Sequence, residues 1–247
     1  MKNTSENSAS AEPVIQVANI HKSFGVVQAL RGISFSLHAG DFLTIFGPNG
    51  AGKTTLIKIL AGLTRATGGT ARVAGFDVSN GDPRLRREIG VIAHATYLYA
   101  DLSALENLVF YAKMYGLDHP GERAAEAIKE VGLEGRMHDR IGTFSRGMQQ
   151  RISIARAVIH DPSILFLDEP FTGLDPHGAK VLKQYLHSLH TKKRTLIMTT
   201  HDLSCGLEMG DKVAVQVKGR FALFEKKDNL DKGGFEELYF ETINNGN

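Results

Sequence analysis

Residues 42–55 read FLTIFGPNGAGKTT, a short apolar run followed directly by a glycine-rich loop. The run has the length of a buried strand, and residues 56–61, LIKILA, have the apolar spacing of a helix that ends near Gly62. The loop fits the pattern GxxxxGK[ST], in which glycines let backbone N–H groups wrap a phosphate chain and the next helix directs its positive end at the same anion. The stretch therefore predicts a strand, a phosphate-binding loop and a helix within an α/β domain.

Polar side chains at two strand ends suit a nucleotide and its metal ion. Lys53 is expected to contact the β- and γ-phosphates, and Thr54 to give Mg²⁺ a hard oxygen ligand. Residues 164–169, ILFLDE, place two acids at the end of a second buried strand, where open α/β sheets bind ligands. We expect Asp168 to hold Mg²⁺, directly or through water, and Glu169 to polarise a water toward the γ-phosphate. Two solvated acids in an ordinary turn are the alternative, and the phosphate loop in the same chain weighs against it.

The overall composition limits the class of protein. The 247 residues carry 29 Lys and Arg against 27 Asp and Glu, and a net charge of +2 excludes a polybasic nucleic-acid binder. One cysteine, Cys205, excludes a disulfide scaffold, and we expect it to be a packed core thiol. Apolar runs stay well short of the about 20 residues of a membrane-spanning helix, so we expect the chain to be soluble by itself. Residues 1–12 have no apolar signal segment and are expected to be a disordered lead-in.

Strand patterns outside the loop indicate how the domain is built. Alternating apolar residues over 14–37 predict antiparallel strands at the start of the fold. The run TLIMTT at 195–200 predicts a buried strand, and residues 213–225 predict a closing hairpin. Residues 231–247 are expected to be a short tail, which leaves 13–230 as one domain.

The segment of about 95–160 has helical spacing instead. Residues 102–115, LSALENLVFYAKMY, predict an amphipathic helix whose capping box is formed by Ser103 and Glu106. A second helix is predicted over 122–131. We interpret the whole segment as a helical subdomain inserted between strands.

Residues 144–151, FSRGMQQR, precede a further apolar-periodic helix. Ser145 fits an N-cap there, so simple helix capping and a ligand-binding role are both open from these residues alone.

From about Val14 to Glu225 the chain resembles the nucleotide-binding subunits of ATP-binding cassette (ABC) transporters. GPNGAGKTT matches the Walker A loop, ILFLDEP matches the Walker B strand, and FSRGMQQR resembles the signature motif LSGGQ. GLDP, with Asp175, matches the D-loop, and TTHD, with His201, matches the switch histidine. Phe24 in KSFG matches the aromatic residue that stacks on adenine. These motifs follow the family's order, and together they are far more specific than any one of them.

The resemblance implies a fold and a reaction. The fold is an α/β P-loop NTPase cassette with a mostly parallel core sheet, an N-terminal antiparallel β subdomain and a helical signature subdomain. The reaction is ATP hydrolysis with Mg²⁺, in which Glu169 acts as base and His201 binds the γ-phosphate and helps to orient the water. Thr54 and Asp168 would hold the metal. The implied ATP-binding residues are Phe24, Gly47, Pro48, Asn49, Gly50, Ala51, Gly52, Lys53, Thr54 and Thr55.

The resemblance also implies partners. Two copies would form a head-to-tail dimer with ATP between one copy's Walker motifs and the other's signature. The signature residues implied in that contact are Ser145, Arg146, Gly147, Met148 and Gln149. Opening and closing of the dimer would move separate membrane-spanning permease subunits, docked near Tyr97 to Leu108, which places the chain at the cytoplasmic side of the inner membrane. No nucleic-acid partner is expected.

Two departures from the family's motifs bear on function. Arg146 and Met148 replace a Gly and a Gln of the signature, but Ser145 and Gly147 are kept, so we interpret the signature as functional. His94 stands where the Q-loop of the family has Gln. Imidazole suits Mg²⁺ poorly, so we expect His94 to take part in catalysis through water or as a donor, with a charge that responds to pH near neutrality.

His94 and the segment that follows it also resemble the ATPase subunits of the haem exporter used in cytochrome c maturation. A cassette that exports a drug, lipid or polysaccharide is the alternative, and the sequence leaves both open. A soluble ABC ATPase acting on ribosomes or DNA is disfavoured, because those proteins carry a second cassette, long coiled-coil insertions or iron–sulfur cysteines. A GTPase is disfavoured because no NKxD motif appears in the sequence.

Overall fold

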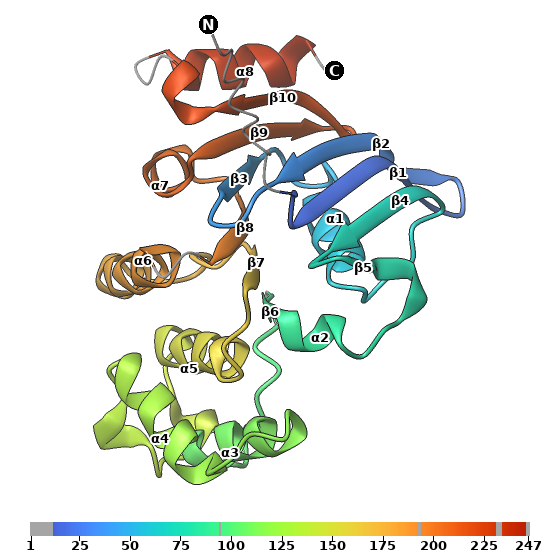
Figure 1. The fold of residues 1–247 in the computed structure, drawn as a ribbon. Coiled ribbons are helices and arrows are strands. Elements are labelled where there is room, and N and C mark those ends of the chain that lie inside the picture. The colour runs from blue at the N-terminus through green and yellow to red at the C-terminus, as the bar shows by residue number, and fades with distance from the viewer. Residues whose placement is uncertain (1–11, 94, 192–193, 231–233, 246–247) are drawn as a thin grey trace, which may run out of the picture.

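Two sheets form the framework of the molecule (Figure 1). The structure, a computed structural model, describes residues 12–93, 95–191, 194–230 and 234–245. The strands of the larger sheet are β3 (Phe42–Phe46), β6 (Ile89–Ile92), β7 (Ile164–Asp168), β8 (Thr195–Thr200), β9 (Lys212–Val217) and β10 (Arg220–Lys226). Their spatial order is β10-β9-β3-β8-β7-β6.

The larger sheet is mostly parallel, as predicted. β3 pairs in parallel with β8 and β9, β7 pairs in parallel with β8 and β6, and β10 is antiparallel to β9. Every residue of β3, β7 and β8 is buried, since helices cover both faces of the sheet. That double burial explains why these strands are nearly continuous apolar runs in the sequence.

The smaller sheet is antiparallel and confirms the predicted N-terminal β subdomain. It contains β1 (Ile15–Phe24), β2 (Val27–Leu37), β4 (Gly68–Val73) and β5 (Phe76–Asp77), in the order β2-β1-β4-β5. Helix α1 (Lys53–Leu60) shares one core with both sheets, in which Leu56 and Ile59 lie among Ile15 of β1 and Ile45 of β3. The phosphate-loop helix therefore starts three residues before the range predicted from its apolar spacing, and its first turn belongs to the loop motif.

The opposite face of the larger sheet is covered by α5 (Arg146–Val158) and α6 (Pro176–Thr191). Ile154 of α5 and Leu182 of α6 share a core with Leu165 and Leu196 of the sheet. Two short helices, α2 (Leu85–Glu88) and α7 (Leu203–Met209), precede β6 and β9.

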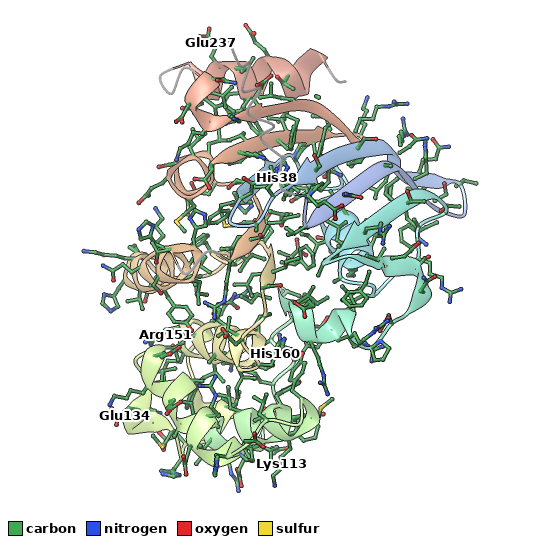
Figure 2. The ribbon with its side chains drawn as sticks, in the orientation of Figure 1. His38, Lys113, Glu134, Arg151, His160 and Glu237 are labelled. Carbon is green, nitrogen blue, oxygen red and sulfur yellow. The ribbon has the colours of Figure 1, made fainter. Side chains whose placement is uncertain are left out.

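The predicted helical subdomain consists of α3 (Ala104–Met114) and α4 (Pro120–Glu130) packed on α5. Its own core includes Leu108, Ile128 and Ile152. The capping box of Ser103 and Glu106 is present, as expected. Figure 2 shows Lys113 and Glu134 at the outer end of this subdomain and His160 at its junction with the rest of the molecule.

The C-terminal segment contains a helix, α8 (Phe235–Asn245), that packs on β9 (Figure 1). Phe235 and Tyr239, one turn apart, are 1% and 7% exposed and lie against Phe46 and the strand β9. The expectation that residues 231–247 are a tail outside the domain is therefore corrected, because Phe235 and Tyr239 join the core. No helix in the described part of the chain has both the length and the apolarity to cross a membrane.

Candidate functional site

The order of the strands brings three functional segments to one edge of the larger sheet. β8 lies between β3 and β7, and all three run in parallel, so their carboxyl ends are neighbours. The glycine-rich loop follows β3, Glu169 follows β7 and His201 follows β8. Segments more than one hundred residues apart in the sequence thereby meet at the C-terminal edge, where α/β sheets bind ligands.

Close packing holds the glycine-rich loop in place. A Cβ atom on Gly47 would lie 2.2 Å from the carbonyl oxygen of Gln216, and one on Gly52 would lie 2.4 Å from that of Ala29, so neither position accepts a side chain. The side-chain amide of Gln216 and the backbone N–H of Gly219 both donate to the carbonyl of Ala51, at 2.9 and 3.0 Å. These contacts fix the cradle shape of the loop.

Lys53 sits inside this cradle. Its Nζ donates to the carbonyl of Gly47 at 2.6 Å and lies 3.5 Å from Oε1 of Glu169, and the residue is 6% exposed. Beside it a cavity of about 260 Å³ is lined by residues 48–55, by Glu169 and by Val27 and Gln28 of β2. Helix α1 begins at this cavity with no acidic residue in its first turn, so its N-terminal N–H groups favour an anion there.

Two carboxylates and a histidine complete the arrangement. Glu169 has a backbone φ of +52°, and its carboxylate contacts Lys53 through Oε1 and Nδ1 of His201 through Oε2, the latter at 2.8 Å. Asp168 is 5% exposed, and its Oδ1 accepts a hydrogen bond from the hydroxyl of Thr54 at 3.1 Å. The structure therefore brings together Lys53, Thr54, Asp168, Glu169 and His201, as the sequence predicted.

The donors at this site fit Mg²⁺. Thr54 and Asp168 present hard oxygen atoms in direct contact beside the phosphate cradle. Mg²⁺ is commonly held by one or two protein oxygens together with phosphate oxygens and water, and this pair of residues matches that donor set.

The aromatic residue that the sequence predicts to stack on adenine lies in a more open part of the site. Phe24, at the end of β1, is 53% exposed and pairs with Val27, which lines the cavity. Nζ of Lys22 lies 4.7 Å from the centre of the Phe24 ring. The phenyl ring is thus available at the edge of the cavity for stacking on a base.

The signature residues lie apart from this cavity in the same chain. Ser145 caps α5 by accepting from the backbone N–H of Met148 at 3.4 Å. Arg146 and Gln149 line a different cavity of about 540 Å³, next to Thr96 and Tyr97. Within one copy, residues 145–149 therefore do not contribute to the phosphate cradle.

Two predicted residues remain to be placed. The Asp175 carboxylate accepts from the backbone N–H of Gly178 at 2.6 Å and caps the first turn of α6. His94 lies outside the described residues.

Sequence reasoning missed two residues that support the site. Gln216 on β9 braces the loop through Ala51, and Thr199 on β8 contacts Asp168 at the end of β7 and Glu169 directly after it. The two neighbouring threonines before His201 could have indicated the role of Thr199, since hydroxyl groups at the end of a buried strand need hydrogen-bond partners. Nothing in the pattern VAVQV marks Gln216 as a partner of a loop some 165 positions earlier.

This arrangement defines a P-loop nucleoside-triphosphatase. It combines a phosphate loop and its lysine with a hydroxyl–carboxylate pair and a glutamate that contacts a histidine. The comparisons with known proteins give the family. A family model described as "ABC transporter" matches residues 30–172, and the chain belongs to this family as an ATP-binding, ATP-hydrolysing subunit.

Relatives and solved structures agree with that assignment. The linearmycin resistance ATP-binding protein LnrL of Bacillus subtilis is 37% identical over 220 residues, which cover 88% of this chain and 70% of that protein. A fluoroquinolones export ATP-binding protein of Mycobacterium tuberculosis is 38% identical over 204 residues, which cover 82% of this chain and 66% of that protein. The dimeric post-hydrolysis structure of the ATP-binding cassette MJ0796 bound to ADP and Pi has a TM-score of 0.79 at 27% identity, over 86% of this chain and 98% of that one.

Proposed function

We propose that this ABC ATPase powers an exporter by hydrolysing ATP between two copies of the chain, docked on separate membrane-spanning permease subunits. The observation that carries the hydrolytic part is the convergence of Lys53, Glu169 and His201 at one phosphate cradle. Similarity to proteins named for resistance and export supports the transport part.

The contacts of the site suggest how its residues act on ATP. The γ-phosphate binds the ammonium group of Lys53 and so displaces the Glu169 carboxylate from its ion pair with that group. The released carboxylate then accepts a proton from the attacking water. His201, on the other carboxylate oxygen, keeps Glu169 oriented and donates toward the phosphate. Thr54 and Asp168 would hold Mg²⁺, which would neutralise charge on the phosphate oxygens.

A second copy of the chain supplies the missing donors. Ser145 and Gly147 stand at the start of α5, away from the cradle of their own copy. In the head-to-tail dimer they face the partner's γ-phosphate, so ATP joins the copies and its hydrolysis separates them. The dimeric state of the similar cassette bound to ADP and Pi supports this arrangement.

An apolar surface on the helical subdomain fits a permease. Tyr97, Tyr99, Phe110 and Met114 are between 40% and 67% exposed, near a groove of about 380 Å³ that Tyr97 itself lines. Leu108, the far end of the range expected from the sequence, is fully buried in the subdomain core. We therefore place the dock on the exposed aromatic residues and Met114, at the cytoplasmic face of the inner membrane.

Of the two substrate classes that the sequence left open, we propose the one that contains drugs, lipids and polysaccharides. The reported relatives are named for linearmycin resistance and fluoroquinolone export, which favours a drug-like substrate. Haem export rests on the resemblance around His94 alone. For His94 the proposal is the role expected from the sequence, in which it takes part in catalysis through water or as a donor.

Replacing the proposed base tests the hydrolytic cycle. Glu169→Gln keeps the size and shape of the side chain and removes the proton acceptor, so with ATP it should form a stable dimer and lose turnover by about 100-fold or more. Sedimentation measures the dimer, and phosphate release measures turnover. A variant that stays monomeric with ATP and keeps wild-type turnover would overturn the assignment. Lys53→Ala is the matched control, expected to bind no nucleotide and remain monomeric.

A charge placed on the apolar surface tests whether this surface binds the permease. Met114→Glu should lower the fraction of the chain recovered with membranes from its own cells, because an unpaired carboxylate cannot be buried at a partner without cost. Its ATPase activity in isolation should stay at the wild-type level. Lys129→Glu on α4, also exposed, is the control and should leave membrane recovery unchanged. Equal recovery of both variants would place the permease elsewhere.

A further inference from the structure

A single hydroxyl group in β8 contacts both acids of the site. Oγ1 of Thr199 donates to Oδ1 of Asp168 at 2.7 Å and accepts from the backbone N–H of Glu169 at 3.1 Å. Thr199 is fully buried, so water does not compete for either hydrogen bond. A threonine hydroxyl has one proton to give, and here that proton is directed at Asp168.

The first contact determines how the Asp168 carboxylate is turned. Oδ1 accepts from two hydroxyl groups, those of Thr199 at 2.7 Å and Thr54 at 3.1 Å. The hydroxyl group of Thr54 is also one of the two proposed ligands of Mg²⁺. Among the described residues no side chain or backbone group donates to Oδ2, so that oxygen keeps its capacity for a cation or its water shell.

The second contact stabilises an uncommon backbone conformation. Glu169 has a φ of +52°, in the left-handed region that residues with a side chain seldom adopt. Its N–H group is held by Thr199 twice, through the carbonyl and the hydroxyl oxygen, each at 3.1 Å. This conformation turns the chain after β7 so that the carboxylate reaches Lys53 and His201.

We propose that Thr199 is the positioning residue of the hydrolytic site: its hydroxyl group orients the Asp168 carboxylate for Mg²⁺ and holds the Glu169 backbone in the conformation that presents the base. The inference rests on the proposed roles of Asp168 and Glu169. Thr199 acts through these two residues and does not line the cavity at the phosphate loop. Groups that orient metal ligands in this way commonly change metal affinity or activity by about 10- to 100-fold when they are removed.

The test compares Thr199→Val with Thr199→Ser and with a control on the same strand. Valine keeps the shape and strand preference of threonine but lacks the hydroxyl, whereas serine keeps the hydroxyl. Thr195→Val is the matched control: Thr195 is buried at the other end of β8, and its hydroxyl bonds to the N–H of Gly40 and the carbonyl of His38, away from the site. Thermal unfolding of all variants confirms that they fold.

Two measurements separate positioning from structure. Thr199→Val should lower kcat by about 10- to 100-fold, while KM for ATP changes less. The gain in ATP affinity on adding Mg²⁺, measured by calorimetry against EDTA, should also shrink, with affinity in EDTA unchanged. Thr199→Ser should restore both quantities, and Thr195→Val should keep both.

Several results would overturn the inference. Wild-type kcat and a wild-type Mg²⁺ gain in Thr199→Val would do so, as would equal losses in Thr199→Val and Thr195→Val, or failure of Thr199→Ser to restore them. Failure of the proposed function is a different result, because a wild-type chain that hydrolyses no ATP contradicts the roles of Asp168 and Glu169 themselves.

Discussion

Glu169 and Lys53 form an ion pair in the structure, with Oε1 of the carboxylate 3.5 Å from the ammonium group, and His201 holds the other carboxylate oxygen. The same lysine suits a phosphate, so the pair and the substrate compete for one cation. In the function proposed above, binding of the γ-phosphate to Lys53 would therefore release the Glu169 carboxylate from this ion pair.

Cys205 is a second residue whose environment has a measurable consequence. It is 3% exposed on α7, and burial raises the pKa of its thiol to about 12. In the unfolded chain the thiol loses its proton near pH 8.5. As the pH rises, the unfolded chain therefore loses this proton at a lower pH than the folded chain does. The stabilisation of the folded state by Cys205 is fully present below about pH 8 and decreases as the pH rises toward 12.

We expect the native thiol to be unreactive at pH 8 to 9 and fully reactive in denaturant. A chromogenic thiol reagent measures both rates. Rapid labelling of the folded protein would contradict the burial of Cys205. The sequence anticipated a packed core thiol, because no other cysteine or metal-ligand set accompanies it.

Among the elements, α3 shows how local sequence sets a boundary. Ser103 accepts from the N–H of Glu106, and the Glu106 carboxylate accepts from the N–H of Ser103, which fixes the first turn. The helix then presents Leu108 to the subdomain core and Phe110 and Met114 to the exterior. The capping box thereby determines the orientation of the proposed permease dock.

Ser103→Ala should lower the free energy of unfolding by about 1 kcal/mol, since the first turn loses its side-chain acceptor. In a chain of this size that corresponds to a fall in Tm of about 2 to 4 °C. Calorimetric unfolding provides the measurement. Ser36→Ala on β2, where the serine is exposed, is the control and should leave Tm unchanged. Equal effects of the two substitutions would show that the cap is not formed in solution.

The elements that the sequence predicted well are those with strong local signals. The apolar strands of the parallel sheet and the capped helix α3 follow from periodicity and from Ser103 and Glu106. The sequence does not show that helix α8 joins the core, because Phe235 and Tyr239 contact Phe46 and the strand β9, and Phe46 is far from them in the sequence. Thr199 escaped prediction for a related reason, since its role depends on pairing between strands that are about 30 positions apart.

On the scale of the whole molecule, the site is connected both to the C-terminal helix and to the helical subdomain. The phosphate loop is braced by Gln216 of β9, and Tyr239 of α8 packs on Phe46, the last residue of β3 before that loop. On the other side, Gln150 of α5 donates to the carbonyl of Pro170 at 3.1 Å, immediately after Glu169. The helical subdomain and the C-terminal helix therefore both contact segments that carry the chemistry.

Tyr239→Ala should lower the free energy of unfolding by about 3 kcal/mol, because it leaves a cavity against Phe46 and β9. Chemical denaturation measures the loss, and a decrease in ATP affinity should accompany it if the loop loosens. Phe240→Ala, at the neighbouring exposed position, should cost less than about 1 kcal/mol. A Tyr239→Ala protein as stable as the wild type would mean that α8 does not dock on the core.

The pairing of β7 with β8 aligns Asp168 with Thr199 and leaves His201 two residues further on, beside Glu169. Side chains of a strand alternate between its faces, so adding or removing one residue within β8 would move every following side chain to the opposite face. Such a change would separate Thr199 from Asp168 and His201 from Glu169 in a single step. The length of β8 thus fixes two contacts at once, that of Thr199 with Asp168 and that of His201 with Glu169. We therefore expect the insertion or deletion of one residue in β8 to damage the site far more than most substitutions do.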